Sequence, residues 1–245
     1  MHTPRIYCSE PIGTGTSVSL PAEPARHLVR VLRMSVGDKL TLFDGSGGEF
    51  EASIASVDKR SVSVEIHTHQ DVERESPLTL NLLQAVAKGD NADWVVQKAV
   101  ELGVASIQPM LTERTVVRLS PERAAKRHIH WLGIIAGACE QCGRNRPPIL
   151  YPTRSLPDLL QNRPRDIDGF ILTPGGASCL ERSRLPPTAL DLVIGPEGGF
   201  SDQEVEMAVA AGLNPLRLGP RILRAETATV AAVTAVQSRW GDLAR

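Results

Sequence analysis

Long apolar runs, a dense set of cysteines and an excess of charge of one sign are all missing from this sequence of 245 residues. No uncharged segment reaches the roughly 18 residues that a membrane-spanning helix needs, which excludes a transmembrane protein. The first 20 residues contain no apolar stretch that resembles a signal-peptide core, so we expect a cytoplasmic protein. The length favours one large domain or two modest ones.

Only four cysteines occur, which is too few for a disulfide scaffold in a chain of this length. Cys139 and Cys142 have the spacing of a redox motif, but they follow the apolar run 129–138 and so fall near the end of a predicted helix. A helix dipole raises a thiol pKa at that end, and zinc would need a second close pair of ligands. We therefore expect no metal, and a thiol enzyme is kept only as an alternative.

Net charge is nearly absent as well, at -1 from 27 basic and 28 acidic residues. The average hides two opposed regions. Residues 114–165 contain ten basic and three acidic residues, a net +7, so the remainder carries -8. Further basic residues recur at helical spacing between 26 and 33. These clusters keep a polyanionic partner open, although an ordinary solvated face is the alternative for each.

Short alternating segments up to about residue 70 predict half-buried strands that close into a small β-barrel. The predicted strands cover 16–20, 38–43, 49–54 and 61–66, and one helix is predicted over 22–33. The polar stretch 67–77 reads as a linker, and Pro77 marks a restart. These features divide the chain into a barrel over 1–74 and a second domain over 75–245.

Beyond Pro77 strands alternate with helices, a pattern typical of a mostly parallel sheet covered on both faces. The strands are predicted over 78–87, 104–110, 169–173, 190–194 and 215–218. The helices are predicted over 91–102, 121–139, 202–211 and 226–240. Ser201 and Glu204 form a predicted capping box at the start of the third of these helices.

Three glycine-bearing loops, 173–176, 195–200 and 218–224, each follow a predicted strand. Ligands of parallel sheets collect beyond the carboxyl ends of the strands, and glycine allows the backbone to approach a flat ligand closely. No Walker loop and no dinucleotide fingerprint is present, and Glu197 would repel a phosphate. A ligand with a positive centre and an adenine edge, such as S-adenosylmethionine, fits the loops better.

Several motifs in a fixed order resemble signatures of the ribosomal RNA small subunit methyltransferase E family. They include Gly-Pro-Glu-Gly-Gly at 195–199, Leu-Gly-Pro-Arg-Ile-Leu-Arg-Ala-Glu-Thr-Ala at 218–228 and Ala-Cys-Glu-Gln-Cys-Gly-Arg-Asn at 138–145. The stretches 97–103, 4–7, 30–34 and 42–45 extend the likeness over nearly the whole chain.

This resemblance implies an α/β fold with an N-terminal PUA-like RNA-binding β-barrel and a C-terminal SPOUT methyltransferase domain that contains a trefoil knot. It also implies a homodimer that uses S-adenosyl-L-methionine to methylate N3 of a specific uridine in 16S rRNA, on the assembled small ribosomal subunit. A non-catalytic RNA-binding module of the ribosome-assembly type is the alternative, and cofactor binding would separate the two.

The candidate site residues fall into three groups, of which the resemblance implies the cofactor residues and the basic clusters supply the RNA residues. A base and donors of hydrogen bonds to the uracil oxygens are needed for catalysis. Glu226 ranks first as the base, although a helix-start carboxylate is its structural alternative. The small residues of the helix from Glu226 suit either an internal core or a dimer contact.

The catalytic candidates are Glu226, Arg224, Arg144, Glu140 and Arg5; the cofactor candidates are Thr173, Pro174, Ile194, Gly195, Glu197, Gly199, Leu218, Gly219, Ile222 and Leu223; and the RNA candidates are Arg26, His27, Arg30, Arg33, Arg114, Arg118, Arg123, Lys126 and Arg127.

Overall fold

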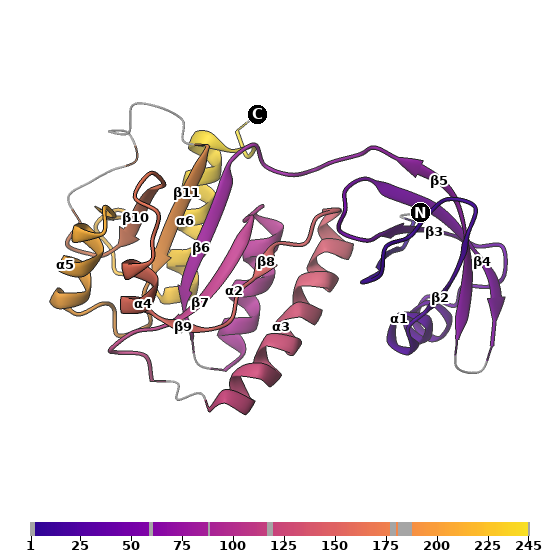
Figure 1. Cartoon of the computed structure of the whole chain (residues 1–245), viewed down its shortest axis with the longest axis horizontal. Coiled ribbons are helices and arrows are strands. Elements are labelled where there is room, and N and C mark those ends of the chain that lie inside the picture. Colours follow the sequence, from indigo (N-terminus) through magenta and orange to yellow (C-terminus); the bar gives the residue numbers. More distant parts are fainter. Residues whose placement is uncertain are drawn as a thin grey trace. The chain divides into compact units, whose positions relative to one another are not determined.

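The computed structural model describes residues 3–58, 61–87, 89–116, 120–176, 180 and 188–244. The chain, traced in Figure 1, divides into two compact units. The first unit joins residues 1–75 to the segment 136–147, and the second joins 76–135 to 148–245. The first unit is therefore built from two stretches of chain that lie far apart in the sequence.

A five-stranded sheet in the order β1-β3-β4-β5-β2 forms the framework of the first unit. β1 runs parallel to β3, and the other neighbouring pairs are antiparallel. All four predicted strands are present, and the pattern missed only the short first strand. The strands are β1 (Arg5–Tyr7), β2 (Ser17–Leu20), β3 (Lys39–Phe43), β4 (Glu49–Val57) and β5 (Val62–Gln70).

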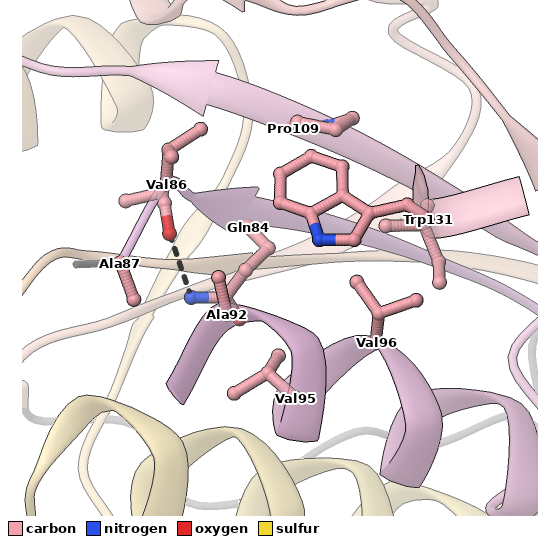
Figure 2. Close-up of a pocket in the computed structure, with 10 residues that line it drawn as sticks. Gln84, Val86, Ala87, Ala92, Val95, Val96, Pro109 and Trp131 are labelled. Atoms are coloured by element: carbon pink, nitrogen blue, oxygen red, sulfur yellow. Dashed lines mark hydrogen bonds between the residues drawn. The ribbon is translucent and has the colours of Figure 1, made fainter. Parts of the chain in front are cut away.

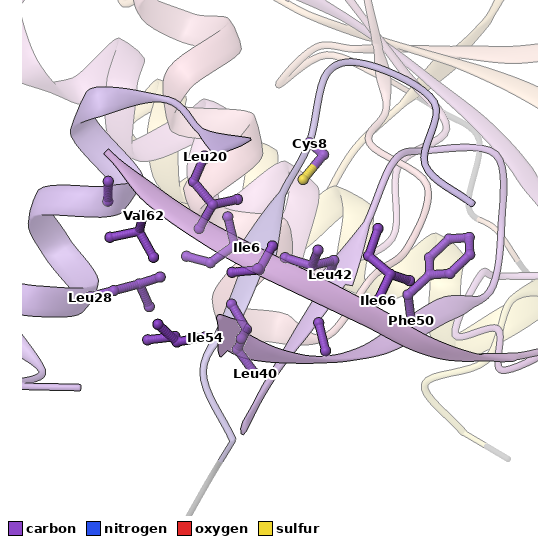
Figure 3. Packing of buried hydrophobic residues seen from close by; sticks show 13 residues of the cluster. Ile6, Cys8, Leu20, Leu28, Leu40, Leu42, Phe50, Ile54, Val62 and Ile66 are labelled. Carbon is purple, nitrogen blue, oxygen red and sulfur yellow. The ribbon is translucent and has the colours of Figure 1, made fainter. Parts of the chain in front are cut away.

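One apolar cluster packs on the inner face of this sheet (Figure 3). Alternate residues of each strand point into it, as a two-residue period requires, so that Leu40 and Leu42 are buried on either side of Thr41. Leu28, which comes from the helical segment, is fully buried and points toward Ile54 and Val62 in Figure 3. The cluster therefore fixes the helical segment to the sheet.

The helix predicted over 22–33 is shorter than expected and changes type along its length. α1 (Ala22–Arg26) passes directly into a π-helical turn, η1 (His27–Val31). Arg33 lies beyond the helical segment, with a left-handed backbone at φ 56°. Helical spacing predicted the buried face of this segment but contained no signal for the wider turn.

The linker predicted over 67–77 is wrong in its first four residues, because β5 continues to Gln70. Polar pairs extend the ladder there: Thr68 and Gln70 both donate to the Glu51 carboxylate, at 3.1 and 2.6 Å. An exposed strand held by polar side chains lacks the apolar alternation by which strands are recognised in a sequence.

A parallel sheet in the order β12-β10-β11-β6-β7-β8, with β9 paired to β7, forms the second unit within the described residues. The predicted mostly parallel sheet is confirmed. Its strands are β6 (Thr79–Ala85), β7 (Ser106–Leu111), β8 (Ile149–Leu150), β9 (Arg154–Ser155), β10 (Asp168–Leu172), β11 (Ala189–Ile194) and β12 (Asn214–Leu216).

Helices cover both faces of this sheet (Figure 1). On one face Leu83 and Val193 pack against Leu156 of α4 and Ala208 of α5. On the other face Gln84 accepts a hydrogen bond from Thr229 of α6, at 2.7 Å. The sequence pattern missed β8, β9 and α4. The helices are α2 (Asp90–Glu101), α3 (Pro121–Cys142), α4 (Leu156–Gln161), α5 (Asp202–Ala210) and α6 (Ala225–Trp240).

Candidate functional site

The three glycine-bearing loops follow β10, β11 and β12, which are neighbours in the parallel sheet. Their carboxyl ends therefore lie at one edge. The backbone N–H of Thr173 donates to Leu216 O at 2.9 Å, which joins the first loop to β12. A Cβ atom on Gly176 would lie 2.8 Å from the Leu216 carbonyl carbon, so only glycine permits this approach of the two backbones. The sheet thus brings the three loops together at one edge.

The loop after β11 is a tight turn closed by the Gly199 N–H, which donates to Pro196 O at 2.9 Å. Gly199 has a positive φ of 67°, which favours glycine. The predicted capping box is confirmed, because Ser201 caps α5 and the Glu204 carboxylate accepts the backbone N–H of Ser201. The same carboxylate also accepts the backbone N–H of Glu113. The turn is held in place by its own helix and by the segment after β7.

Open space surrounds several glycines of these loops. A Cβ atom on Gly175, Gly199 or Gly219 would meet no protein atom within 4 Å. Ile222 is 87% exposed, which is unusual for an apolar side chain beside a tight loop. A flat, partly apolar ligand would fit here, because this sheet edge offers backbone groups, open space and an exposed apolar side chain. The cofactor candidates Pro174 and Glu197 are also exposed, while Thr173, Gly195, Leu218 and Leu223 are half-buried and Ile194 is buried.

Two catalytic candidates lie in the second unit, where the third loop meets α6. Arg224 is the residue that precedes the helix, and Glu226 lies in its first turn. Arg224 is exposed and Glu226 is half-buried. Neither forms an ion pair within the described part of the chain. Both side chains therefore remain available to a ligand at the loops.

Arg5 and Arg144, in the first unit, have protein partners. Arg5 is buried and donates to the Glu49 carboxylate and to Asn145 Oδ1, each at 2.5 Å. Arg144 is also buried and pairs with Glu75 at 2.5 Å. Burial alone would raise the pKa of Glu49, but hydrogen bonds from arginine lower that pKa below its usual range. These pairs fasten residues 136–147 to the sheet of the first unit.

Glu140 is the third catalytic candidate in the first unit, and its carboxylate accepts the backbone N–H of Tyr7 at 2.9 Å. Burial raises the pKa of Glu140 above its ordinary value of 4.5, although the hydrogen bond from Tyr7 acts in the opposite direction. A raised pKa makes a carboxylate a better proton acceptor near neutrality. Glu140 therefore combines a structural contact to Tyr7 with a raised pKa.

Replacing Glu140 by glutamine is expected to raise the melting temperature at about pH 7–8 and to leave it unchanged near pH 4. The folded pKa of Glu140 exceeds the unfolded one, so the folded state binds the proton more tightly. The contribution of this group is therefore complete at acid pH and is lost as the pH rises through the folded pKa. Thermal unfolding from pH 4 to 8 measures it, with Glu10→Gln as the control because Glu10 is exposed. A parallel decline of wild type and Glu140→Gln would contradict this assignment.

Cys139, one member of the predicted thiol pair, is free but buried. Cys139 is buried inside α3, and burial raises its pKa to about 12. Burial likewise raises the pKa of Cys8 to about 11. Because the thiolate is the reactive form, neither residue suits nucleophilic or redox chemistry near neutral pH. The structure therefore adds no support to the thiol-enzyme alternative.

An apolar recess in the second unit was not predicted from the sequence (Figure 2). Trp131 of α3 faces Val95 and Val96 of α2 across it, below the ends of β6 and β7. The Trp131 indole N–H donates to Asp93 at 2.9 Å, which orients the ring. No sequence motif marks such a recess, because it arises from the packing of two helices on one sheet face.

The RNA candidates are mostly exposed, as contact with a large anion requires. Arg127 is half-buried, and its guanidinium lies over the Trp131 ring at 5.5 Å from the centroid. Arg114 is exposed and donates to Gly198 O at 3.0 Å, so it also supports the loop after β11. Arg118 lies outside the described residues. The remaining exposed candidates are Arg26, His27, Arg30, Arg33, Arg123 and Lys126.

No group of three or more His, Cys, Asp or Glu side chains in the described part of the chain could hold a metal ion. No helix within those residues combines the length and the apolar character needed to cross a membrane.

Comparison with known proteins agrees with this architecture. A family model for the RNA methyltransferase domain matches residues 74–237, and one for the RNA methyltransferase PUA domain matches residues 20–66. The ribosomal RNA small subunit methyltransferase E of Buchnera aphidicola subsp. Schizaphis graminum is 34% identical over 98% of each chain. That of Bacillus subtilis is 34% identical over 89% of this chain and 88% of its own.

Solved structures extend the likeness to three dimensions. A Neisseria gonorrhoeae ribosomal RNA small subunit methyltransferase E bound to S-adenosyl methionine has a TM-score of 0.92 at 40% identity, over 99% of this chain and 100% of its own. A Legionella pneumophila protein in complex with the same cofactor has a TM-score of 0.95 at 43% identity, over the same shares. Because a family model covers more than half of its length and relatives above 30% identity match it almost end to end, the chain belongs to the ribosomal RNA small subunit methyltransferase E family.

Proposed function

We propose that this protein transfers a methyl group from S-adenosyl-L-methionine to N3 of a specific uridine in 16S rRNA. The observation that carries the proposal is the meeting of three glycine-bearing loops at one edge of the parallel sheet, with open space beside Gly175, Gly199 and Gly219. Two relatives with the same fold over nearly the full chain were solved with this cofactor. The assembled small ribosomal subunit as substrate, a cytoplasmic location and a homodimer belong to the same proposal.

The backbone groups of the three loops would hold the cofactor. Thr173, Gly195, Gly199, Leu218 and Gly219 contribute peptide groups at the sheet edge. The apolar side chains of Ile194, Ile222 and Leu223 would flank the adenine, with Pro174 and Glu197 at the exposed rim. When bound, the cofactor supplies a methyl group on a positively charged sulfur. The knot that the resemblance implies for these loops stays a prediction.

Methylation of uracil at N3 requires the protein to remove the proton that this nitrogen carries. That nitrogen becomes nucleophilic only as it loses its proton, so a base has to lie within hydrogen-bond reach. We assign this role to Glu226, which is half-buried beside the third loop and has no competing ion pair within the described residues. Glu140, with its raised pKa, is the second candidate.

Negative charge that develops on the uracil oxygens needs donors at those atoms. Arg224 is exposed and directly precedes α6, so it belongs with Glu226 to the segment that follows the third loop, and we assign it as the donor. Arg5 and Arg144 are buried, and each is paired with a half-buried carboxylate. We therefore assign them a positioning role, in which they hold the segment that contains Glu140.

Methyl transfer itself is the decisive measurement. Small subunits that lack the modification would be incubated with the protein and S-adenosylmethionine labelled in its methyl group, and the nucleosides then separated. We expect label in 3-methyluridine. Label in another nucleoside would refute the assignment to N3, and absence of label would refute the catalytic function. Absence of cofactor binding, measured by calorimetry, would favour the RNA-binding module instead.

A further inference from the structure

Three aliphatic side chains are exposed at the end of the helical segment of the first unit. Val31, Leu32 and Val36 are 64%, 43% and 62% exposed. The sequence between Arg26 and Val36 contains three arginines and His27 but no acidic residue. We name residues 26–36 the helix-end surface. It combines a local excess of positive charge with apolar groups, which are individually unfavourable in water.

Packing on the other side of the segment fixes which residues face outward. Ala25 and Leu28 are buried in the core of the first unit, and Val29 and Met34 pack against it. Within the helical segment, positions 25, 28 and 29 share the face that packs on the core, and the side chains at 31, 32 and 36 are not among those that contact it. The Met34 N–H donates to Leu28 O at 3.0 Å, which closes the end of the segment. The exposure is therefore built into the packing of the segment.

Backbone geometry on this surface is unusual as well. Arg33 is the only non-glycine residue with a positive φ within the described part of the chain, and it follows a π-helical turn. Glycine adopts this conformation freely at a helix end, whereas a side chain with a Cβ atom is strained there. π-Helical turns and strained residues both concentrate at functional sites. The Arg33 side chain is exposed at this turn, where a large anion can reach it.

We infer that the helix-end surface docks the RNA substrate through unstacked bases as well as through phosphates. The basic side chains contact phosphate oxygens, while Val31, Leu32 and Val36 pack against the faces of bases outside a helix. RNA is recognised mainly at unstacked bases, and aliphatic side chains can wedge against base steps in nucleic acids. The absence of acidic residues from this stretch favours a polyanion over a basic or neutral partner. This inference rests on the proposed function and adds an apolar docking element to it.

A double substitution of the apolar residues tests the inference. Val31→Ser combined with Leu32→Ser is expected to weaken binding of the small subunit about tenfold. Because no charge is removed, the slope of log affinity against log salt should stay that of the wild type. Val209→Ser is the matched control: Val209 lies on α5 of the second unit, with a similar 48% exposure. Unchanged affinity of the double variant would overturn the apolar role.

Arg33→Gly separates the side chain from the backbone. Glycine removes the strain, so the melting temperature is expected to stay equal or to rise by about 1–3 °C. Loss of one phosphate contact should lower the salt slope by about 0.7–0.9 and weaken RNA binding at low salt. Arg33→Lys keeps the charge and should preserve the slope. A glycine variant with full affinity would overturn the role of Arg33.

Failure of this inference can be told apart from failure of the proposed function. If the wild type places no methyl group on any RNA, the function fails whatever the helix-end variants do. If the wild type methylates the subunit and the variants keep its KM, only the docking inference fails. Binding of S-adenosylmethionine should be unchanged in every helix-end variant. Variants that bind naked 16S rRNA normally but lose affinity for assembled subunits would overturn RNA as the occupant and point to a ribosomal protein.

Discussion

Glu226→Gln is expected to lower kcat for methyl transfer by about 100- to 10,000-fold. Glutamine keeps the size of the side chain and cannot accept the proton that uracil N3 must lose. The affinity for S-adenosylmethionine and the KM for the subunit should change little, because the carboxylate is assigned to the proton and not to binding. Single-turnover rates with saturating cofactor and subunit give the comparison directly.

A structural role for Glu226 would look different. A carboxylate in the first turn of a helix stabilises the helix by about 0.3–1 kcal/mol, so its loss would appear mainly in the melting temperature. Glu206→Gln is the control, because Glu206 is exposed on α5, away from the third loop. If Glu226→Gln retained its full single-turnover rate, the base would lie elsewhere, and Glu140→Gln would be the next variant to measure.

Gly176→Ala is expected to weaken the binding of S-adenosylmethionine by about 5- to 150-fold. A methyl group at this position would lie 2.8 Å from the Leu216 carbonyl carbon and 3.0 Å from Arg217 N, both of which are backbone atoms. Neither atom can move without displacing β12 and the loop that follows it. Overpacking of this kind typically costs about 1–3 kcal/mol, and here it separates two of the loops assigned to the cofactor. Titration calorimetry with S-adenosylmethionine measures the effect.

The neighbouring glycine provides a matched control. A Cβ atom on Gly175 would meet no protein atom within 4 Å, so Gly175→Ala should leave the melting temperature of the cofactor-free protein unchanged. Gly176→Ala should lower that temperature as well as the affinity. Equal cofactor affinity in Gly176→Ala and wild type would show that the approach of the two loops is not needed for binding.

Apolar periodicity predicted most strands and helices of both units, because burial on one face imposes a regular spacing. It failed where polar contacts extend an element. β5 reaches Gln70 through hydrogen bonds to Glu51, and no apolar alternation marks that stretch. The short β8 and β9 were missed for a related reason, since two residues are too few to show any period.

The candidate site was predictable in part. The three loops could be recognised one by one as glycine-bearing turns after strands. Their meeting depends on the order β12-β10-β11, and strand order is not encoded in local pattern. The partners of Arg5 and Arg144 were equally hidden, because Asn145 and Glu75 come together with them only in the folded unit. Motif resemblance identified these arginines without indicating that they are already paired.

We expect that an N-terminal fragment does not form the complete first unit. A chain cut after residue 75 would lack 136–147, and with it Asn145, which accepts from Arg5, and Arg144, which pairs with Glu75. Arg5 would then lose its hydrogen bonds to Arg144 O and Asn145 and keep only its ion pair with Glu49. The same dependence orders folding during synthesis. We expect the first unit to be completed only after residues 136–147 have been synthesised, that is, after 76–135 of the second unit.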